Sequence, residues 1–335
     1  MERFSRYNEI KKSKKLEGRC EMEKFKNHKG YSRMYQENKL TLGLFFPIES
    51  YMGDVPEMDI EKQMKLAKRA EELNFASLFV RDVPLRDPNF GDVGQIYDPF
   101  TYLGYVTANT EKIALGTGSI ILTLRHPLHV AKAAASIDRL SGERLILGVA
   151  TGDRPIEFPA FFVNPEDRSE LFREAIGVMK KAWKEHFPVI DSLRVHMTNG
   201  DLLPKPKLSD IPVMVTGHSG QSPEWIAEHS DGWIYYPRAL KFQRALIENW
   251  RSLTEEFKPF TQSLYVDLAE DPYHVPIPIN QGFRTGRVFL IEFLESLRDA
   301  GVNHVIINLK YGQRPVEEVI EELGEFVLPH FPALS

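Results

Sequence analysis

The segment 111–152 constrains the fold of this chain more than any other stretch. Two nearly continuous apolar runs, at 113–122 and 145–149, flank residues 127–140, in which apolar residues recur at helical spacing. Apolar runs without polar alternation predict strands buried on both faces, and a helix between two such strands predicts a parallel pair. Each strand carries small residues toward its end, at 116–119 and 148–152, which leave room for a ligand or for close backbone approach.

The same alternation of strand and helix extends from residue 40 to the end of the chain. Strands are predicted at 42–47, 76–80, 113–122, 145–149, 211–215, 232–236, 263–269 and 304–309, and helices at 60–73, 99–109, 127–140, 169–186, 223–229, 239–257, 286–300 and 316–326. Eight strands that alternate with helices predict an α/β protein, a (β/α)8 or TIM barrel with insertions, over residues 40–332. An open doubly wound sheet would need a glycine-rich fingerprint after its first strand, and the residues after Pro47 supply none.

The charge of the chain is unevenly distributed. The net charge is −5, yet residues 1–39 hold 12 Lys and Arg against 6 Asp and Glu. Because these basic residues lack interleaved aromatic side chains, we expect a solvated or partly helical N-terminal extension rather than a nucleic-acid-binding arm. The acidic remainder also argues against nucleic acid as the principal partner.

Cysteine content and hydropathy exclude several classes of protein. A single cysteine, Cys20, rules out an intramolecular disulfide framework and any multi-cysteine metal or iron–sulfur site, and no metal site is predicted. The apolar runs are far shorter than the roughly 20 residues of a membrane span. The charged N-terminus lacks a secretory signal, so we expect a cytoplasmic protein without membrane contact.

A glycine-punctuated turn ahead of Pro223 is the strongest candidate binding element. Its candidate ligand-binding residues are Thr216, Gly217, His218, Ser219, Gln221 and Ser222. Free backbone N–H groups at a helix start, together with the helix dipole, favour an anion. An equally good interpretation is that Ser222 simply caps a helix that begins at Pro223.

Two charged residues, Arg81 and Asp82, follow a buried strand, where a barrel places its catalytic groups. They are candidate catalytic residues, and a structural salt bridge at the base of the following loop is the alternative. His126 stands at the turn into a helix, and we expect it to be structural.

A motif in the run 126–144 resembles the signature of a known family. His-Pro at its start, Asp138, Ser141-Gly142 and Arg144 hold fixed spacings after a strand that carries Gly-Thr. Further matching stretches are a first strand that ends in Pro47, the helix segment 67–71 and the turn 216–225. Over residues 40–330 the chain thus resembles the flavin-dependent, bacterial-luciferase-like monooxygenases.

The resemblance implies FMN at the C-terminal face of the barrel. It implies a cis peptide bond near Gly118-Ser119 beneath the flavin ring, and Ser219 and Ser222 as phosphate ligands. An arginine that often serves the same phosphate in the family is replaced here by Thr151. Arg154 lies three residues on, and its guanidinium suits bidentate phosphate binding. The expected cofactor residues are therefore Gly118, Ser119, Thr151, Gly152, Asp153 and Arg154, together with the turn residues named above.

The implied reaction uses reduced FMN and O2, with one oxygen atom transferred to a small organic substrate and the other to water. A separate flavin reductase and a homodimer are also implied. The alternatives are an F420 (deazaflavin)-dependent reductase or dehydrogenase and a flavin-binding protein without turnover. The second alternative stays open because a histidine that the family often has near Arg81 is absent.

Two long loops, 85–98 and 270–285, are candidate lids over the flavin, because structureless loops of this length are usually functional or disordered. Their candidate closing residues are Phe90, Tyr97, Tyr273, His274, Phe283 and Arg284.

Overall fold

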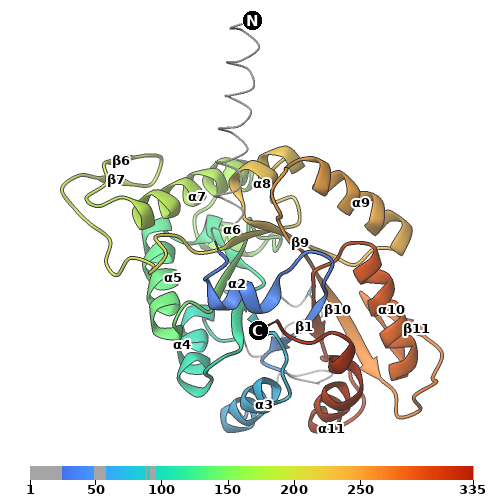
Figure 1. The fold of residues 1–335 in the computed structure, drawn as a ribbon. Coiled ribbons are helices and arrows are strands. Elements are labelled where there is room, and N and C mark those ends of the chain that lie inside the picture. Colours follow the sequence, from blue (N-terminus) through green and yellow to red (C-terminus); the bar gives the residue numbers. More distant parts are fainter. Residues whose placement is uncertain (1–24, 49–57, 88, 91–95, 335) are drawn as a thin grey trace, which may run out of the picture.

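The chain folds into a closed barrel of parallel strands surrounded by helices (Figure 1). The computed structural model describes residues 25–48, 58–87, 89–90 and 96–334. Its barrel strands are β1 (Thr41–Phe46), β2 (Ser77–Val80), β3 (Ala114–Thr117), β5 (Leu145–Ala150), β8 (Val213–Thr216), β9 (Gly232–Tyr235), β10 (Phe260–Leu268) and β13 (His304–Asn308). Each pairs in parallel with the next in that order, and β13 pairs with both β10 and β1. The predicted (β/α)8 barrel is confirmed.

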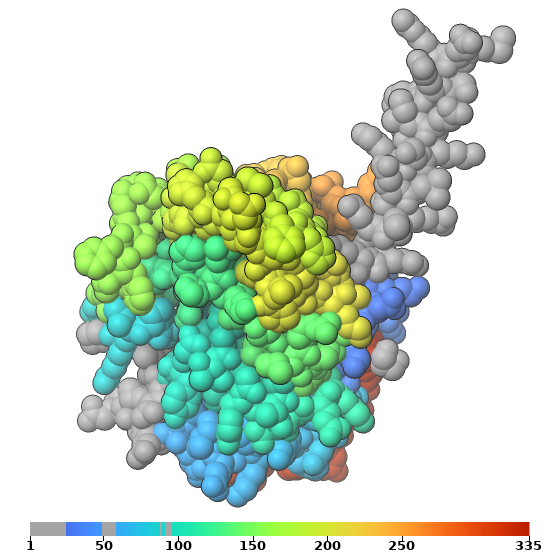
Figure 2. Space-filling model, turned by 90° about the vertical axis from the view of Figure 1, so that its left-hand side faces the viewer, coloured from blue at the N-terminus to red at the C-terminus, as the bar shows by residue number. Residues whose placement is uncertain are grey.

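The outer helices follow the predicted order. They are α3 (Ile60–Glu72), α4 (Pro99–Asn109), α5 (Pro127–Ser141), α7 (Arg168–Lys184), α8 (Pro223–His229), α9 (Leu240–Ser252), α10 (Arg287–Asp299) and α11 (Val316–Glu322). One side of the molecule is formed by α3, α4 and α5, from light blue to green, with the yellow-green segment after α7 above them (Figure 2). Short additions are α6 (Glu157–Ala160), β4 (Ile120–Ile121), four 3-10 or π turns and the elements described below.

Helix α5 shows how local sequence sets an element. His126 is its N-cap residue and Pro127 its first residue, where a missing N–H costs nothing. Gly142 ends it in the left-handed region, at φ +69°, a conformation that glycine adopts without steric cost. Between these ends, Val130, Ala134 and neighbouring residues at helical spacing bury one face against the barrel.

Two stretches predicted to be irregular contain strands. Residues between α7 and β8 include an antiparallel pair, β6 (Ile190–Asp191) and β7 (His196–Met197). The predicted lid loop 270–285 is not structureless, because it holds β11 (Ile277–Ile279) and β12 (Gly282–Thr285). β12 pairs with β10, and β11 pairs with β12 at the end of the sheet. The prolines of this stretch suggested a loop, but proline is tolerated in an edge strand.

The described end of the N-terminal segment packs against the barrel. Helix α2 (Lys29–Met34) lies across the N-terminal ends of the strands, near the C-terminus of the chain (Figure 1). Met34 and Tyr35 are buried there, and the Tyr35 hydroxyl lies 3.1 Å from Thr261 Oγ1. His28 is buried as well, with its Nε2 3.2 Å from Asp138 Oδ1. Residues 25–39 therefore cover this end of the barrel rather than forming a solvated extension, because their apolar side chains fill it. Residues 1–24 lie outside the described residues.

Candidate active site

A cavity of about 520 Å³ opens at the C-terminal ends of the barrel strands. Its volume lies within the range of sites for small ligands and cofactors. Of the residues predicted from sequence, it brings together Arg81, Asp82, Gly118, Ser119, Thr151, Gly152, Asp153, Arg154, Thr216, Gly217, His218 and Ser219. Gln221 and Ser222 do not line it.

The end of β3 forms one wall of the cavity. The peptide bond between Gly118 and Ser119 is cis, so the conformation implied by the family resemblance is confirmed. A side chain at Gly118 would meet the ring of Phe45, because a Cβ there would lie 2.9 Å from Phe45 Cε1. The Ser119 hydroxyl is hydrogen-bonded to the Thr216 hydroxyl. This contact joins the end of β3 to the end of β8 across the cavity.

The turn after β8 has an unusual backbone. Gly217, Ser219 and Gly220 all have left-handed φ values, of +57°, +46° and +70°. The Ser219 hydroxyl donates to the Thr216 carbonyl at 2.8 Å, which braces the turn. Turns with left-handed residues direct successive N–H groups to one side, as anion-binding nests do. The turn therefore presents backbone donors beside the cavity.

Gln221 and Ser222 do not line the cavity but support the turn through hydrogen bonds. Ser222 Oγ accepts a hydrogen bond from the Trp225 backbone at 3.3 Å, so this serine caps α8. The buried Gln221 side chain donates to the carbonyls of Ser169 and Ser219, at 3.0 and 3.1 Å. Of the two roles left open for Ser222, the structure shows the cap.

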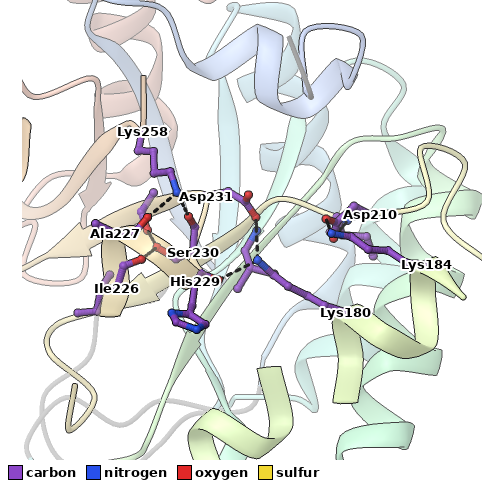
Figure 3. Close-up of polar contacts among 12 residues, drawn as sticks. Lys180, Lys184, Asp210, Ile226, Ala227, His229, Ser230, Asp231 and Lys258 are labelled. Atoms are coloured by element: carbon purple, nitrogen blue, oxygen red, sulfur yellow. Dashed lines mark hydrogen bonds and ion pairs between the residues drawn. The ribbon is translucent and has the colours of Figure 1, made fainter. Parts of the chain in front are cut away.

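The opposite end of α8 is anchored by two lysines from other elements (Figure 3). Lys180 of α7 donates to the His229 carbonyl at 2.7 Å, and Lys258 donates to the Ser230 carbonyl at 2.9 Å. Ammonium groups satisfy the last carbonyls of a helix and interact favourably with its dipole. Lys180 also lies 3.9 Å from the carboxylate of Asp231, which accepts a hydrogen bond from the backbone of Val213. These contacts fix α8 and thereby the turn at the cavity.

Arg154 brings a cation into the site. Its side chain is buried, and the guanidinium carbon lies 4.7 Å from the centre of the Phe90 ring. Such stacking holds a guanidinium plane in place. Nearby, buried Glu157 accepts a hydrogen bond from the Leu85 backbone at 3.3 Å, and burial raises the pKa of its carboxyl group.

Asp82 forms a salt bridge, but its partner is Arg125. The Arg125 guanidinium donates to both carboxylate oxygens of Asp82, at 2.8 and 2.7 Å. The Ile121 backbone donates to the same carboxylate at 3.0 Å, and Arg125 also pairs with Asp98. Arg81 borders the cavity beside them. No sequence signal marked Arg125, because the pair joins segments that are distant along the chain.

The candidate lid residues fall into two groups. Phe90 lines the cavity, whereas Tyr97, Tyr273, His274, Phe283 and Arg284 do not. Phe283 packs edge-on against Phe293, and Arg284 pairs with Asp267 at 2.9 Å. Residues 88 and 91–95 of the first loop lie outside the described residues.

Sequence reasoning missed one wall of the cavity. It comprises residues in or just after β9, β10 and β13 and in the turn between β11 and β12, namely Tyr235, Tyr236, Ser263, Tyr265, Asn280, Gln281, Asn308 and Tyr311. For Tyr235, Tyr236, Asn308 and Tyr311, the position at or after the end of a strand was the available signal, because every strand of a barrel delivers side chains to that face.

The described residues hold neither a metal-binding cluster nor a membrane-spanning helix. Within 25–48, 58–87, 89–90 and 96–334, no group of three or more His, Cys, Asp or Glu residues is arranged to hold a metal ion. Over the same ranges, no helix combines the length and the apolar character needed to cross a membrane.

Known proteins resemble the chain in sequence and in fold. The model of the luciferase-like monooxygenase family matches residues 40–269. The alkanal monooxygenase beta chain of Photorhabdus luminescens is 26% identical over 252 residues, which cover 72% of this chain and 71% of that protein. The F420-dependent glucose-6-phosphate dehydrogenase of Beutenbergia cavernae is 33% identical over 172 residues, 49% of each chain.

A solved structure of a monooxygenase from Streptomyces bottropensis superposes with a TM-score of 0.75. The superposition covers 87% of this chain and 99% of that one, at 18% sequence identity. At this identity the likeness shows a shared fold.

Proposed function

The chain belongs to the luciferase-like monooxygenase family, and from that premise we propose that it is an FMN-dependent monooxygenase acting on a small organic substrate. The observation that carries the proposal is the placement of Arg154, the turn 216–219 and the small residues Gly118-Ser119 around one cavity. These groups suit a flat cofactor that carries a phosphate. A cation and backbone donors lie at the end that would bind the phosphate, and exposed backbone lies at the end that would contact the ring.

The phosphate end of FMN is assigned to Arg154 and Ser219, while Gly217 shapes the turn and donates its own N–H to the Ile234 carbonyl at 2.8 Å. A guanidinium can donate two parallel hydrogen bonds to a phosphate, and its stacking on Phe90 reduces the entropy lost on binding. The left-handed turn adds backbone N–H donors, which interact favourably with an anion. Thr151, Gly152 and Asp153 complete this end of the cavity.

The ring end is assigned to the wall formed by Gly118 and Ser119. The absence of a side chain at Gly118 lets the ring of Phe45 pack against the backbone, because a Cβ there would lie 2.9 Å from Phe45 Cε1. Phe45, Ile121 and Ile234 give this part of the cavity an apolar lining that excludes water. A bound, reduced flavin supplies the electrons for oxygen chemistry, while the protein binds, orients and shields it. A separate reductase would deliver those electrons.

Arg154→Met tests the phosphate assignment. We expect FMN affinity to fall about 10- to 100-fold, because a hydrogen bond to a charged group contributes about 1.5–3 kcal/mol. Riboflavin, which lacks the phosphate, should bind both proteins with nearly the same affinity. Calorimetric titration measures both ligands, and Arg139→Met, at an exposed arginine of α5, is the matched control. Equal losses for FMN and riboflavin would show that Arg154 does not bind the phosphate.

Titration with F420 separates the two cofactor classes. The relative that uses F420 makes this comparison necessary. A strong preference for F420 over FMN would replace the monooxygenase proposal with a hydride-transfer enzyme. If FMN binds but oxygen uptake with reduced FMN is unchanged by every candidate substrate, a flavin-binding protein without turnover is favoured.

A further inference from the structure

The two halves of the cavity differ in charge. Its charged lining residues, Arg81, Asp82, Asp153 and Arg154, all follow β2 or β5. The opposite half comes from β9, β10, β13 and the β11–β12 turn, and we call its residues Tyr235, Ser263, Tyr265, Asn280, Gln281, Asn308 and Tyr311 the tyrosine wall. None of these residues carries a charge at neutral pH. Since β5 and β13 lie on opposite sides of an eight-stranded barrel, the cavity has one charged half and one uncharged half.

Two stacked rings form the flat part of the tyrosine wall. The ring centres of Tyr265 and Tyr311 are 5.1 Å apart, and their planes differ by 28°. Tyr265 is buried, and the buried Lys310 places its Nζ 5.8 Å from the centre of the Tyr311 ring. Both tyrosines line the cavity. A preformed aromatic pair of this kind favours a further flat ring over a puckered one, because flat rings can stack or meet edge to face.

Hydrogen-bonding groups lie beside this pair. Asn308 is 6% exposed, and its Oδ1 accepts a hydrogen bond from the Lys310 backbone at 3.0 Å. This contact leaves Nδ2 as the group that can donate into the cavity. In the part of the chain that the structure describes, neither Asn308 Nδ2 nor the Ser263 hydroxyl has a protein hydrogen-bond partner. A ligand that supplies an acceptor here can therefore form a hydrogen bond with the protein and gain affinity.

We propose that the tyrosine wall binds the substrate, and that this substrate is a neutral, flat aromatic compound that carries a hydrogen-bond acceptor. The stacked tyrosines select the flat ring, and Asn308 Nδ2 donates to the acceptor. Charged compounds are disfavoured, because no residue of this wall carries a charge, Lys310 does not line the cavity, and burial of an unpaired charge is costly. The assignment as a substrate site rests on the proposed function, which places the flavin against the charged half.

Three probes of similar size test the proposal on the full chain, both free and saturated with FMN. They are 2-naphthol, its saturated analogue trans-decahydro-2-naphthol, and the anion naphthalene-2-sulfonate. We expect 2-naphthol to bind about 3- to 10-fold more tightly than the saturated alcohol, since aromatic pairs add about 0.5–1.5 kcal/mol beyond buried area. In the FMN-saturated chain, in which the phosphate occupies Arg154, the sulfonate should bind at least about 10-fold more weakly than 2-naphthol. Equal affinity for the flat and saturated alcohols, or tighter binding of the sulfonate to the FMN-saturated chain, would overturn the proposal.

Two substitutions test whether the probes bind at the tyrosine wall. Tyr311→Leu should remove the preference for 2-naphthol over the saturated alcohol, whereas Asn308→Ala should weaken both alcohols by about the same factor, roughly 3- to 10-fold. Tyr105→Leu, at an exposed tyrosine of α4, is the matched control and should change neither. If Tyr311→Leu still binds 2-naphthol more tightly than the saturated alcohol, the probe binds elsewhere and the tyrosine wall is rejected as its site.

The same titrations distinguish the two proposals. Arg154→Met should weaken FMN and leave 2-naphthol binding to the free chain unchanged. If FMN fails to bind while the probe preferences hold, the proposed function fails and the ligand class of the tyrosine wall stands. If FMN binds as expected but the probe preferences are absent, only the ligand class fails.

Discussion

The two ends of the barrel use polar residues in opposite ways. At the N-terminal end, buried His304 lies 2.7 Å from Thr41 Oγ1 and 2.8 Å from Ser77 Oγ, beneath the segment 25–39. These polar groups satisfy one another and are covered by protein. At the C-terminal end, Asn308 and its neighbours open into a cavity. A strand such as β13 therefore starts in a closed structural network and ends in a candidate binding site only a few residues later.

The comparison teaches that polarity alone does not mark a functional residue. His304 has a perturbed titration, because burial lowers its pKa to about 3. Its ring nitrogens are hydrogen-bonded to protein hydroxyls and it does not line the cavity, so it is structural nonetheless. Perturbed groups are functional candidates only where they also face a cleft.

The largest expected effect is a loss of stability when the segment that covers the N-terminal end of the barrel, residues 25–39, is disrupted. Met34→Ala removes a fully buried side chain of the covering segment. We expect the free energy of unfolding to fall by about 2–5 kcal/mol, as for other large-to-small core substitutions. Chemical denaturation measures the loss, and Leu140→Ala, at an apolar residue that is 72% exposed, should cost much less. Flavin affinity of the folded variant should not change. A weak effect at Met34 would show that residues 25–39 do not close the barrel.

A smaller effect is expected at the open end from Asp82→Asn. The substitution preserves shape but leaves the Arg125 guanidinium without its main carboxylate partner. Because the Asp82 side chain is buried while Arg125 is partly exposed, we expect a loss of about 2–3 kcal/mol of unfolding free energy. Arg125→Met should cause a similar loss, and the double variant should lose less than the sum of the two.

This double-mutant cycle also decides between the two roles considered for Asp82. A structural role predicts that oxygen uptake per folded molecule changes alike in both single variants. Loss of activity confined to Asp82→Asn, with Arg125→Met active, would instead make Asp82 a catalytic residue.

The smallest expected effect is the pH dependence of stability that His304 contributes at the N-terminal end of the barrel. The pKa of His304 is lower in the folded protein, about 3, than its ordinary value of 6.5. Between these values the unfolded chain binds the additional proton, so stability is complete above about pH 6.5 and falls as the pH decreases. We expect a loss of about 1 kcal/mol between pH 6.5 and pH 5.5 from this group. The slope of unfolding free energy against pH should decrease in His304→Gln, and an unchanged slope would assign the effect to other groups.

Local pattern was enough to predict the barrel. The buried runs of β3 and β5, the Pro127 start and Gly142 end of α5, and the motif at 126–144 each follow from neighbouring residues. They predicted the fold and the family, both confirmed, and the cis peptide at Gly118-Ser119 followed from the family. Residues 81–82 were predicted at the cavity because a barrel delivers its strand ends to one face, whereas 118–119 and 151–154 were implied by the family resemblance, and all of them line the cavity.

The sequence by itself thus determined the barrel, the family and one half of the cavity lining. Only the tertiary structure decided that Asp82 pairs with Arg125, that β11 and β12 extend the sheet, that Tyr265 stacks on Tyr311, and that residues 25–39 cover the closed end. The physical reason is the range of the interactions. Periodicity and capping act between residues a few positions apart, whereas side-chain pairing across the barrel depends on closure, which brings together segments that no local pattern relates.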